Sequence, residues 1–204
     1  MSATTRKPRG QGHERRAEIL AAAKALFLAD GYAAFTTRKL AAAVGLSQTG
    51  LYVYFGGKEE IFDALCRQSF AELAAEYRRI GADAPEGLAG LAALIGAYIA
   101  FGLAHPDEYR LTFLEGPGLM KMAAAESAEP GIAGQTFALL RGCLERLASQ
   151  GLLRPVDLTL ATHTVWLAAH CLTSIFIARP GYLRADRAQL IDALVETLLK
   201  GLAA

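Results

Sequence analysis

The sequence predicts an all-α protein of about nine helices, and three observations support that fold class. Ala and Leu dominate the 204 residues and only seven are Pro, a composition that favours helix over strand. Apolar residues recur at spacings of three and four, the period of an amphipathic helix. Glycine and proline separate these segments, and no window alternates as a strand does. We expect an N-terminal three-helix unit joined to a larger helical body.

The N-terminal segment predicts an arm followed by a first helix. Residues 1–13 are polar and form a flexible basic arm that carries Arg6, Lys7 and Arg9. A helix is expected from Glu14, and Asp30-Gly31 ends it, because glycine is a favoured C-terminal stop. Its apolar positions at helical spacing are Ile19, Leu20, Ala23, Leu26 and Phe27.

Two short helices follow. Thr36 or Thr37 caps a helix that runs to about Val44, and Gly45 breaks it. Ser47 caps the next helix, which covers about residues 48–54. The spacing therefore predicts two helices joined by a tight turn.

The rest of the chain predicts six longer helices. The first opens at Lys58, where Glu59 and Glu60 suit the positive end of the helix dipole, and runs to about Ile80. The others are expected near residues 86–104, 106–114, 132–149, 156–178 and 186–202, separated by Pro and Gly.

Charge divides the chain into two parts. Residues 1–58 hold nine Lys or Arg and three Asp or Glu, a net +6, whereas residues 59–204 carry a net −5. A basic head on an acidic body favours a polyanion as the partner of the head alone. The domains expected are therefore an arm at 1–13, a helix-turn-helix domain at 14–58, and a body at 59–204.

Other features exclude several classes of protein. Cys66, Cys143 and Cys171 are widely spaced and form no CxxC motif, which indicates reduced thiols in a cytoplasmic protein, with no metal site and no cofactor. The N-terminus has no apolar signal region. The most apolar stretch, residues 165–178, is too short and too polar to span a bilayer, so no membrane partner is expected.

The most informative segment is residues 36–58. Two short helices joined at Gly45 make a helix-turn-helix pattern, and apolar residues can pack them together, namely Leu40, Val44, Leu46 and Leu51. An ordinary helical hairpin has the same apolar spacing. The outward face favours nucleic acid instead, because its residues are polar, aromatic or basic and none is acidic: Gln48, Thr49, Tyr52, Tyr54 and Lys58.

This segment resembles the DNA-binding region of the TetR family of bacterial regulators, over residues 14–62 without a gap. The residues that carry the resemblance are Phe27, Gly31-Tyr32, Thr36-Thr37, Leu40-Ala41, Val44-Gly45-Leu46-Ser47, Leu51-Tyr52-Val53-Tyr54-Phe55 and Lys58-Glu59. It implies a homodimeric repressor that binds double-stranded operator DNA and is released from it by a small apolar or aromatic effector.

The resemblance also implies roles for single residues. Thr37 and Arg38 match positions that contact phosphate or a base edge, and Gln48 and Thr49 match the start of the recognition helix. The remaining DNA contacts implied are Tyr52, Tyr54, Lys58 and the arm residues Arg6, Lys7 and Arg9. The chain departs from the family pattern at Gly50, which offers no side-chain contact, and at Gly57, where a polar cap is frequent. Val53 can touch a thymine methyl group or simply pack.

The body resembles a TetR subgroup whose C-terminal domain carries a Trp-His-Gly signature, with Cys171 in place of the Gly. Trp166 and His170 lie four residues apart on one helix face and can line an effector pocket. Alternatively, His170 is a buried histidine satisfied within the protein. The same two interpretations, pocket wall or core, apply to Tyr98, Phe101, Tyr109 and Phe113.

The last two predicted helices, about 156–178 and 186–202, match the place where the family forms a four-helix dimer interface. Leucines recur every four residues in the last helix, at Leu190, Leu194, Leu198 and Leu202. Packing within one chain is the alternative.

Two other functions stay open: a DNA-binding architectural protein that ignores ligands, and an enzyme that uses His170 and Cys171, although these adjacent residues point about 100° apart on a helix. We expect a regulator and not an enzyme.

Overall fold

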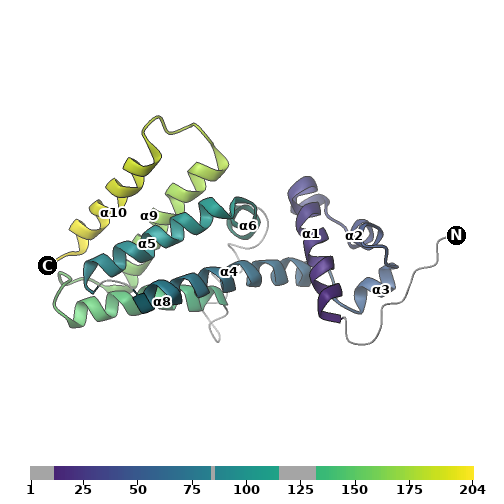
Figure 1. Ribbon diagram of the computed structural model, residues 1–204, viewed down its shortest axis with the longest axis horizontal. Coiled ribbons are helices and arrows are strands. Elements are labelled where there is room, and N and C mark those ends of the chain that lie inside the picture. The colour runs from purple at the N-terminus through teal and green to yellow at the C-terminus, as the bar shows by residue number, and fades with distance from the viewer. Residues whose placement is uncertain (1–11, 84–85, 115–131) are drawn as a thin grey trace.

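The structure is a computed structural model that describes residues 12–83, 86–114 and 132–204 (Figure 1). Arg6, Lys7 and Arg9 of the predicted arm lie outside the described residues. The described part is helical apart from connections and one isolated bridge. Its helices are α1 (Gly12–Ala34), α2 (Thr37–Ala43), α3 (Gln48–Tyr52), α4 (Lys58–Asp83), α5 (Leu88–Ala104), α6 (Pro106–Tyr109), the π-helix η1 (Arg110–Leu114), α8 (Ile132–Ser149), α9 (Leu158–Ala178) and α10 (Arg187–Leu202).

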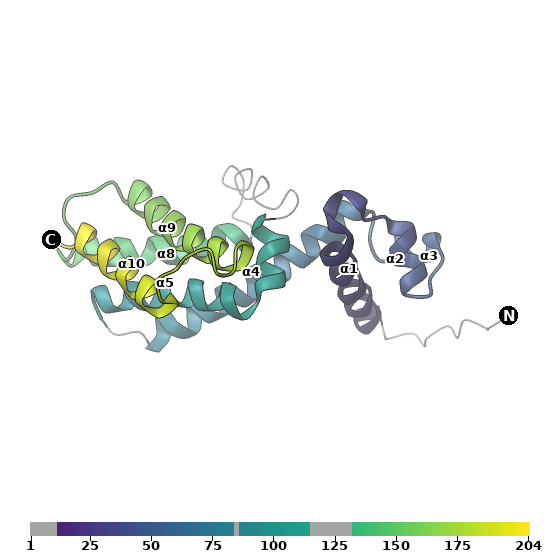
Figure 2. The same cartoon turned by 90° about the horizontal axis from the view of Figure 1, so that it is seen from above.

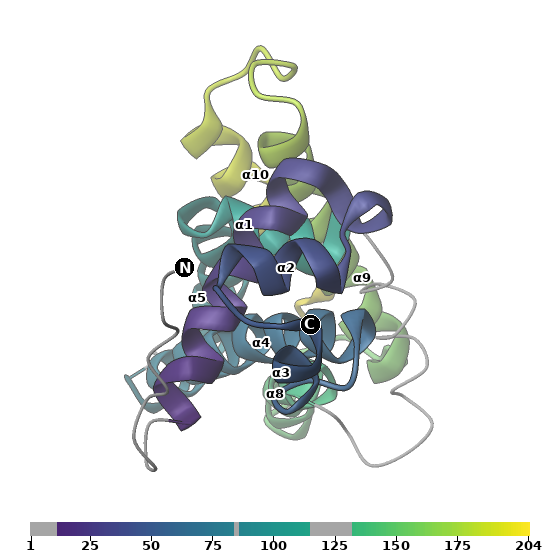
Figure 3. The same ribbon diagram turned by 90° about the vertical axis from the view of Figure 1, so that its right-hand side faces the viewer.

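The all-α fold class is confirmed, and the molecule is elongated. Helices α1–α3 form a head at one end, and α5, α8, α9 and α10 form a body at the other (Figures 1 and 2). Helix α4 begins in the head and runs into the body, so it belongs to both. Seen from the head end, α2 and α3 are the elements nearest the viewer (Figure 3). This places the predicted helix-turn-helix at the tip of the molecule.

The head has its own apolar core around Phe27, which is fully buried. The Phe27 ring stacks on that of Phe35 at 3.9 Å and meets the Phe62 ring edge-on at 5.4 Å. Leu40 and Leu51 are fully buried in the same cluster, so the predicted packing of the two short helices is confirmed. The cluster also takes in the first turns of α4, because a three-helix unit this small needs more apolar surface than it holds itself.

The turns of the head follow the predicted caps. The Thr36 hydroxyl accepts the Lys39 amide at 3.2 Å, and the Ser47 hydroxyl accepts the Gly50 amide at 3.0 Å. Gly45 has φ 63°, a left-handed conformation that glycine adopts without strain. Gly31, at φ 76°, has a non-helical backbone conformation, so the first helix is interrupted there as predicted, and a further helical stretch within the bounds of α1 runs to Ala34.

A second core fills the body between α4, α5, α8 and α9. Where one helix was predicted over residues 106–114, the structure has a four-residue α6 followed by the π-helix η1. This short segment serves both cores, because Tyr109 and Phe113 pack in the body core while Leu111 packs in the head core. A regular helix of this length presents only one apolar stripe. The wider turn of the π-helix lets the segment direct apolar side chains into both cores.

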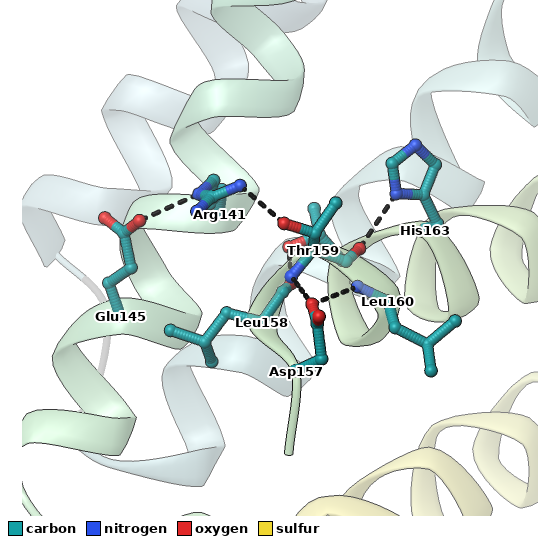
Figure 4. Close-up of polar contacts among 8 residues, drawn as sticks. Arg141, Glu145, Asp157, Leu158, Thr159, Leu160 and His163 are labelled. Atoms are coloured by element: carbon teal, nitrogen blue, oxygen red, sulfur yellow. Dashed lines mark hydrogen bonds and ion pairs between the residues drawn. The ribbon is translucent and has the colours of Figure 1, made fainter.

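The junction of α8 and α9 is fixed by polar contacts (Figure 4). Asp157 caps α9 by accepting the amides of Thr159 and Leu160 at 2.8 and 3.0 Å. Arg141 of α8 donates to the Thr159 hydroxyl at 3.0 Å. The His163 ring lies 2.8 Å from the Thr159 carbonyl oxygen, so this histidine is engaged at the start of its own helix and not with His170.

Helix α9 extends beyond residues 165–178, the stretch that was predicted to be too short and too polar to span a bilayer. The full helix has 21 residues and a mean hydropathy of 1.4, which is long and apolar enough to cross one by length and composition. In the structure one side of α9 packs on α5 and α8 in the body core. Its other side exposes Leu160 and Leu167 at 64% and 49%.

Candidate nucleic-acid interface

Three of the predicted DNA-contacting residues meet on one face of the head. The Gln48 amide nitrogen lies 3.5 Å from both the Thr37 hydroxyl and the Tyr52 hydroxyl. These contacts join the start of α2 to both ends of α3. Hydrogen bonds with Thr37 and then with Gln48 lower the pKa of Tyr52. The face is therefore a connected set of exposed donors and acceptors, of the kind that reads base edges.

The other predicted contacts within the described residues belong to α2, to α3 and the residues that follow it, and to the start of α4. The Lys58 ammonium group lies 4.0 Å from the centre of the Tyr32 ring, so α1 holds it at the start of α4. Arg38 and Thr49 are exposed. Val53 is 79% exposed and does not pack within the chain. A Cβ on Gly50 would lie 3.2 Å from the Ser47 hydroxyl oxygen, so this glycine leaves room for the helix cap.

Several basic residues of the head are engaged inside the protein, which the charge count did not reveal. Arg15 donates to the Val44 carbonyl oxygen at 2.5 Å, and Arg16 donates to the Tyr54 carbonyl oxygen at 2.6 Å. Lys39 pairs with Asp30 at 2.7 Å. These contacts occupy donors of the three side chains but leave the net +6 of residues 1–58 unchanged, because Asp30 is already counted in it and a guanidinium group keeps its charge when it donates to a carbonyl oxygen.

The body core contains a hydrogen-bonded group of three predicted effector residues. His170 Nδ1 lies 2.6 Å from the Tyr109 hydroxyl and 3.1 Å from the Tyr98 hydroxyl. His170 Nε2 lies 3.4 Å from the Ser174 hydroxyl. Burial raises the pKa of Tyr109 to about 12 and lowers the pKa of His170. Both ring nitrogens thus have partners within the chain.

Aromatic rings enclose this group. The Trp166 ring stacks on His170 at 5.0 Å, and the Phe113 ring meets His170 at 5.3 Å. The Phe101 ring lies 4.8 Å from that of His105, and Phe101 packs against the same body core. A cavity of about 20 Å³, room for one water molecule, is lined by Phe70, Leu73, Tyr77, Tyr98, Phe113, Thr136, Phe137, Leu140 and Trp166. A ligand site of ordinary size, about 300 Å³ or more, would require these side chains to move.

The His170 environment has a consequence for pH. Because burial lowers the pKa of the folded ring, the unfolded chain takes up this proton at higher pH than the folded chain does. The stability that the neutral ring contributes is complete above its ordinary pKa of 6.5 and is lost as the pH falls below it. We expect the melting temperature to fall between about pH 7.5 and about pH 5.5, and to fall less in His170→Gln. Equal slopes in the two proteins, measured by circular dichroism, would contradict this account.

The described residues hold no group of three or more His, Cys, Asp or Glu side chains arranged to bind a metal ion.

Together, a capped short helix after a glycine turn, an exposed polar face and a separate helical body define a helix-turn-helix protein with a distinct C-terminal domain. The sequence model of bacterial regulatory proteins of the tetR family matches residues 19–65. That of the tetracyclin repressor-like C-terminal domain matches residues 91–198, more than half of the chain. The chain belongs to the TetR family.

Curated relatives match part of the chain. The transcriptional repressor KstR2 of Mycobacterium tuberculosis is 41% identical over 71 residues, 35% of this chain and 36% of the relative. The nucleoid occlusion factor SlmA of Cronobacter sakazakii is 36% identical over 107 residues, 52% of this chain and 53% of the relative. The chain thus spans about a third to a half of the length of these relatives.

Solved structures match over the whole length. A protein of unknown function from Rhodococcus sp. RHA1 has a TM-score of 0.78 and 26% identity, and the match covers 98% of this chain and all of that one. The ketosteroid transcriptional regulator KstR2 of M. tuberculosis has a TM-score of 0.67 and 23% identity, covering 93% and 95%. At that identity the second match concerns the fold alone.

Proposed function

We propose that the protein is a sequence-specific DNA-binding transcriptional regulator, a cytoplasmic repressor that binds double-stranded operator DNA as a homodimer. The observation that carries the proposal is the joined reading face of Thr37, Gln48 and Tyr52 on the helix-turn-helix. The test is selection of duplexes from a random pool by the full-length protein. A palindromic site with two half-sites about one helical turn apart supports the proposal. Recovery of no preferred sequence refutes it.

Lys58→Ala is expected to weaken binding to all duplexes, because a charged ammonium group at the start of α4 suits a phosphate contact, which is independent of sequence. Loss of one phosphate contact per head reduces the dependence of affinity on salt by about one ion for each subunit. Fluorescence anisotropy with the selected duplex and with random duplex, over a salt series, measures both effects.

Gln48→Ala is the comparison for Lys58→Ala. It removes a base-reading group and no charge, so we expect relaxed sequence preference with an unchanged salt dependence. Two variants that bind the selected duplex like the parent protein would refute this set of contacts.

We propose that the effector is a small neutral ligand that enters beside Tyr98, Tyr109 and His170. The described side chains around the cavity are aromatic, aliphatic or uncharged polar, so an apolar or aromatic molecule with a hydrogen-bonding group suits them. Such a ligand must displace aromatic side chains and take over one of the hydrogen bonds of His170. The Trp166-His170 pair fits the Trp-His-Gly subgroup, whose Gly is Cys171 here. Phe101 is the weakest member of the proposed site because it is not among the residues that line the cavity.

The segment α6–η1 suits the transmission of a change from body to head. Neighbouring residues face the two parts: Tyr109 bonds to His170 in the body, and Glu108 forms an ion pair with Lys24 of α1. Movement of Tyr109 by an entering ligand would therefore act on α1 directly. A ligand that favours the moved state lowers the affinity for DNA by the same coupling free energy.

The proposed homodimer uses α9 and α10. On α9 the exposed residues Leu160, Thr164, Leu167 and Cys171 follow a single face. The predicted leucine stripe of α10 is partly used within the chain, since Leu202 is buried and Leu194 and Leu198 pack on the body core. Helix α9 therefore supplies the more exposed apolar surface for a second copy.

A second candidate, an architectural DNA-binding protein that ignores ligands, has one observation in its favour. A nucleoid occlusion factor, which is not named as a transcriptional repressor, is 36% identical to this chain over 107 residues. This function would be indicated by a selected duplex whose affinity for the protein stays the same when each of a broad set of metabolites is added. An enzyme that uses His170 would instead show turnover that is lost in His170→Ala.

A further inference from the structure

Two consecutive arginines of α1 reach the two ends of the segment that carries the recognition helix. Arg15 donates from Nη2 to the Val44 carbonyl oxygen at 2.5 Å, where α2 ends. Arg16 donates from Nη1 to the Tyr54 carbonyl oxygen at 2.6 Å, just after α3. The turn and α3 lie between these two carbonyl groups. Helix α1 therefore contacts the segment that contains the turn and α3 at both of its ends.

Helix geometry explains why the Val44 carbonyl group is a partner, because Val44 is the C-cap residue of α2. The last carbonyl groups of an α-helix have no helical donor, and they carry the negative end of the helix dipole. A guanidinium group is always charged and has five N–H donors, so it satisfies such a carbonyl and retains donors for other partners. Arg15 uses one of these on Glu18, at 2.6 Å, which fixes its side chain along α1.

Arg16 has further contacts that place it at a junction of three helices. Its guanidinium group lies 4.0 Å from the centre of the buried Phe55 ring. Its Nη2 lies 3.7 Å from Glu60 Oε1, and the other oxygen of Glu60 accepts the Gly56 amide at 2.7 Å. Arg16 thus ties α1 to the end of α3 and to the first turn of α4, the helix that leads into the body.

We infer that Arg15 and Arg16 are positioning residues for the recognition helix, and that they act on DNA affinity through α2 and α3 without binding phosphate themselves. Both arginines count toward the basic charge of the head, and the simpler expectation is a phosphate contact. The described contacts instead commit their guanidinium groups to backbone oxygens, an aromatic ring and carboxylates. This inference rests on the proposed function, because it assumes that the reading face binds DNA.

The salt dependence of binding separates the two roles. With the duplex selected by the parent protein, Arg16→Ala is expected to lose about tenfold in affinity, or about 1.4 kcal/mol, with the salt slope unchanged. Affinity for random duplex should fall less, because a misplaced α3 loses base contacts first. Arg16→Lys should recover part of the loss, since an ammonium group can reach the carbonyl but lacks the planar stack on Phe55. Arg15→Ala should act in the same direction, and Arg38→Ala, an exposed arginine, is the matched control whose slope should fall by about one ion for each subunit.

Hydrogen exchange in the protein without DNA tests the same inference independently. Arg16→Ala is expected to speed amide exchange in residues 45–55 and to leave that in residues 158–178 unchanged. A salt slope that falls as in Arg38→Ala, or parent-like affinity and exchange in Arg16→Ala, would overturn the inference. If Arg16→Ala does not fold, the partial effects of Arg16→Lys decide. A parent protein that selects no duplex refutes the proposed function instead, and the exchange result then stands alone.

Discussion

Leu167→Glu is expected to convert the protein into a folded monomer that no longer binds its selected duplex tightly. Leu167 is 49% exposed on α9, and Leu160, two turns earlier on the same face, is 64% exposed. In a two-fold interface the two subunits contact each other through the same surface patch. One substitution in that patch therefore places two carboxylates, one from each subunit, in the same apolar contact. Their desolvation is unfavourable, and the dimer separates.

The loss of DNA affinity follows from the loss of one half-site. One short recognition helix contacts few base pairs, and a dimer contacts two half-sites together. We expect a loss of roughly 10³-fold, the low end of the usual difference between specific and non-specific binding. Sedimentation velocity gives the oligomeric state, and anisotropy gives the affinity. The melting temperature of the monomer should change little beyond the loss of the partner, because surface substitutions cost little within a chain.

Ala75→Glu is the matched control for Leu167→Glu. Ala75 is exposed on α4, and a glutamate there precedes Arg79 by one helical turn, an arrangement that is neutral to mildly favourable. This variant should remain dimeric and bind like the parent protein. A dimeric Leu167→Glu with parent-like affinity would show that a different surface joins the two copies.

The features of the head that were predictable depend on neighbours in sequence. Thr36 and Ser47 cap their helices through amides three residues away, and Gly45 forms the turn through its own backbone freedom. Such local rules can be seen in the sequence alone. Arg15 and Arg16 could not be assigned this way, because their carbonyl partners lie 29 and 38 residues further along the chain. Nothing in a basic residue's spacing distinguishes a backbone contact from a phosphate contact.

The same limit applies to the body. The four-residue spacing of Trp166 and His170 predicts a shared face, and the two rings do stack. That His170 would meet Tyr109 depends on how α6 and α9 pack. The π-helix escaped prediction for a related reason. The sequence of residues 106–114 resembles that of one helix, but in the structure its side chains pack in both the head core and the body core.

Gly102→Ala is expected to destabilise the protein by about 1–3 kcal/mol, the usual cost of overpacking a core. A Cβ at Gly102 would lie 2.4 Å from Thr173 Cγ2 and 2.8 Å from the Tyr109 ring. Both neighbours are buried, so α5 must separate from α9 or Tyr109 must leave its place. At about 2–4 °C per kcal/mol for a chain of this size, the melting temperature should fall measurably in differential scanning calorimetry.

Gly96→Ala, on the same helix, separates packing from helix propensity. A Cβ at Gly96 would have nothing within 4 Å, so alanine there should stabilise α5 by up to about 1 kcal/mol. Gly102→Ala has the same gain in helix propensity, and its net loss of stability therefore measures the contact with Thr173 and Tyr109.

The two glycine variants also test the proposed link through α6. If Tyr109 transmits movement to α1 through Glu108 and Lys24, Gly102→Ala should change the affinity for the selected duplex. Gly96→Ala should leave it unchanged, and a duplex affinity unaltered in both variants would remove α6 from the coupling.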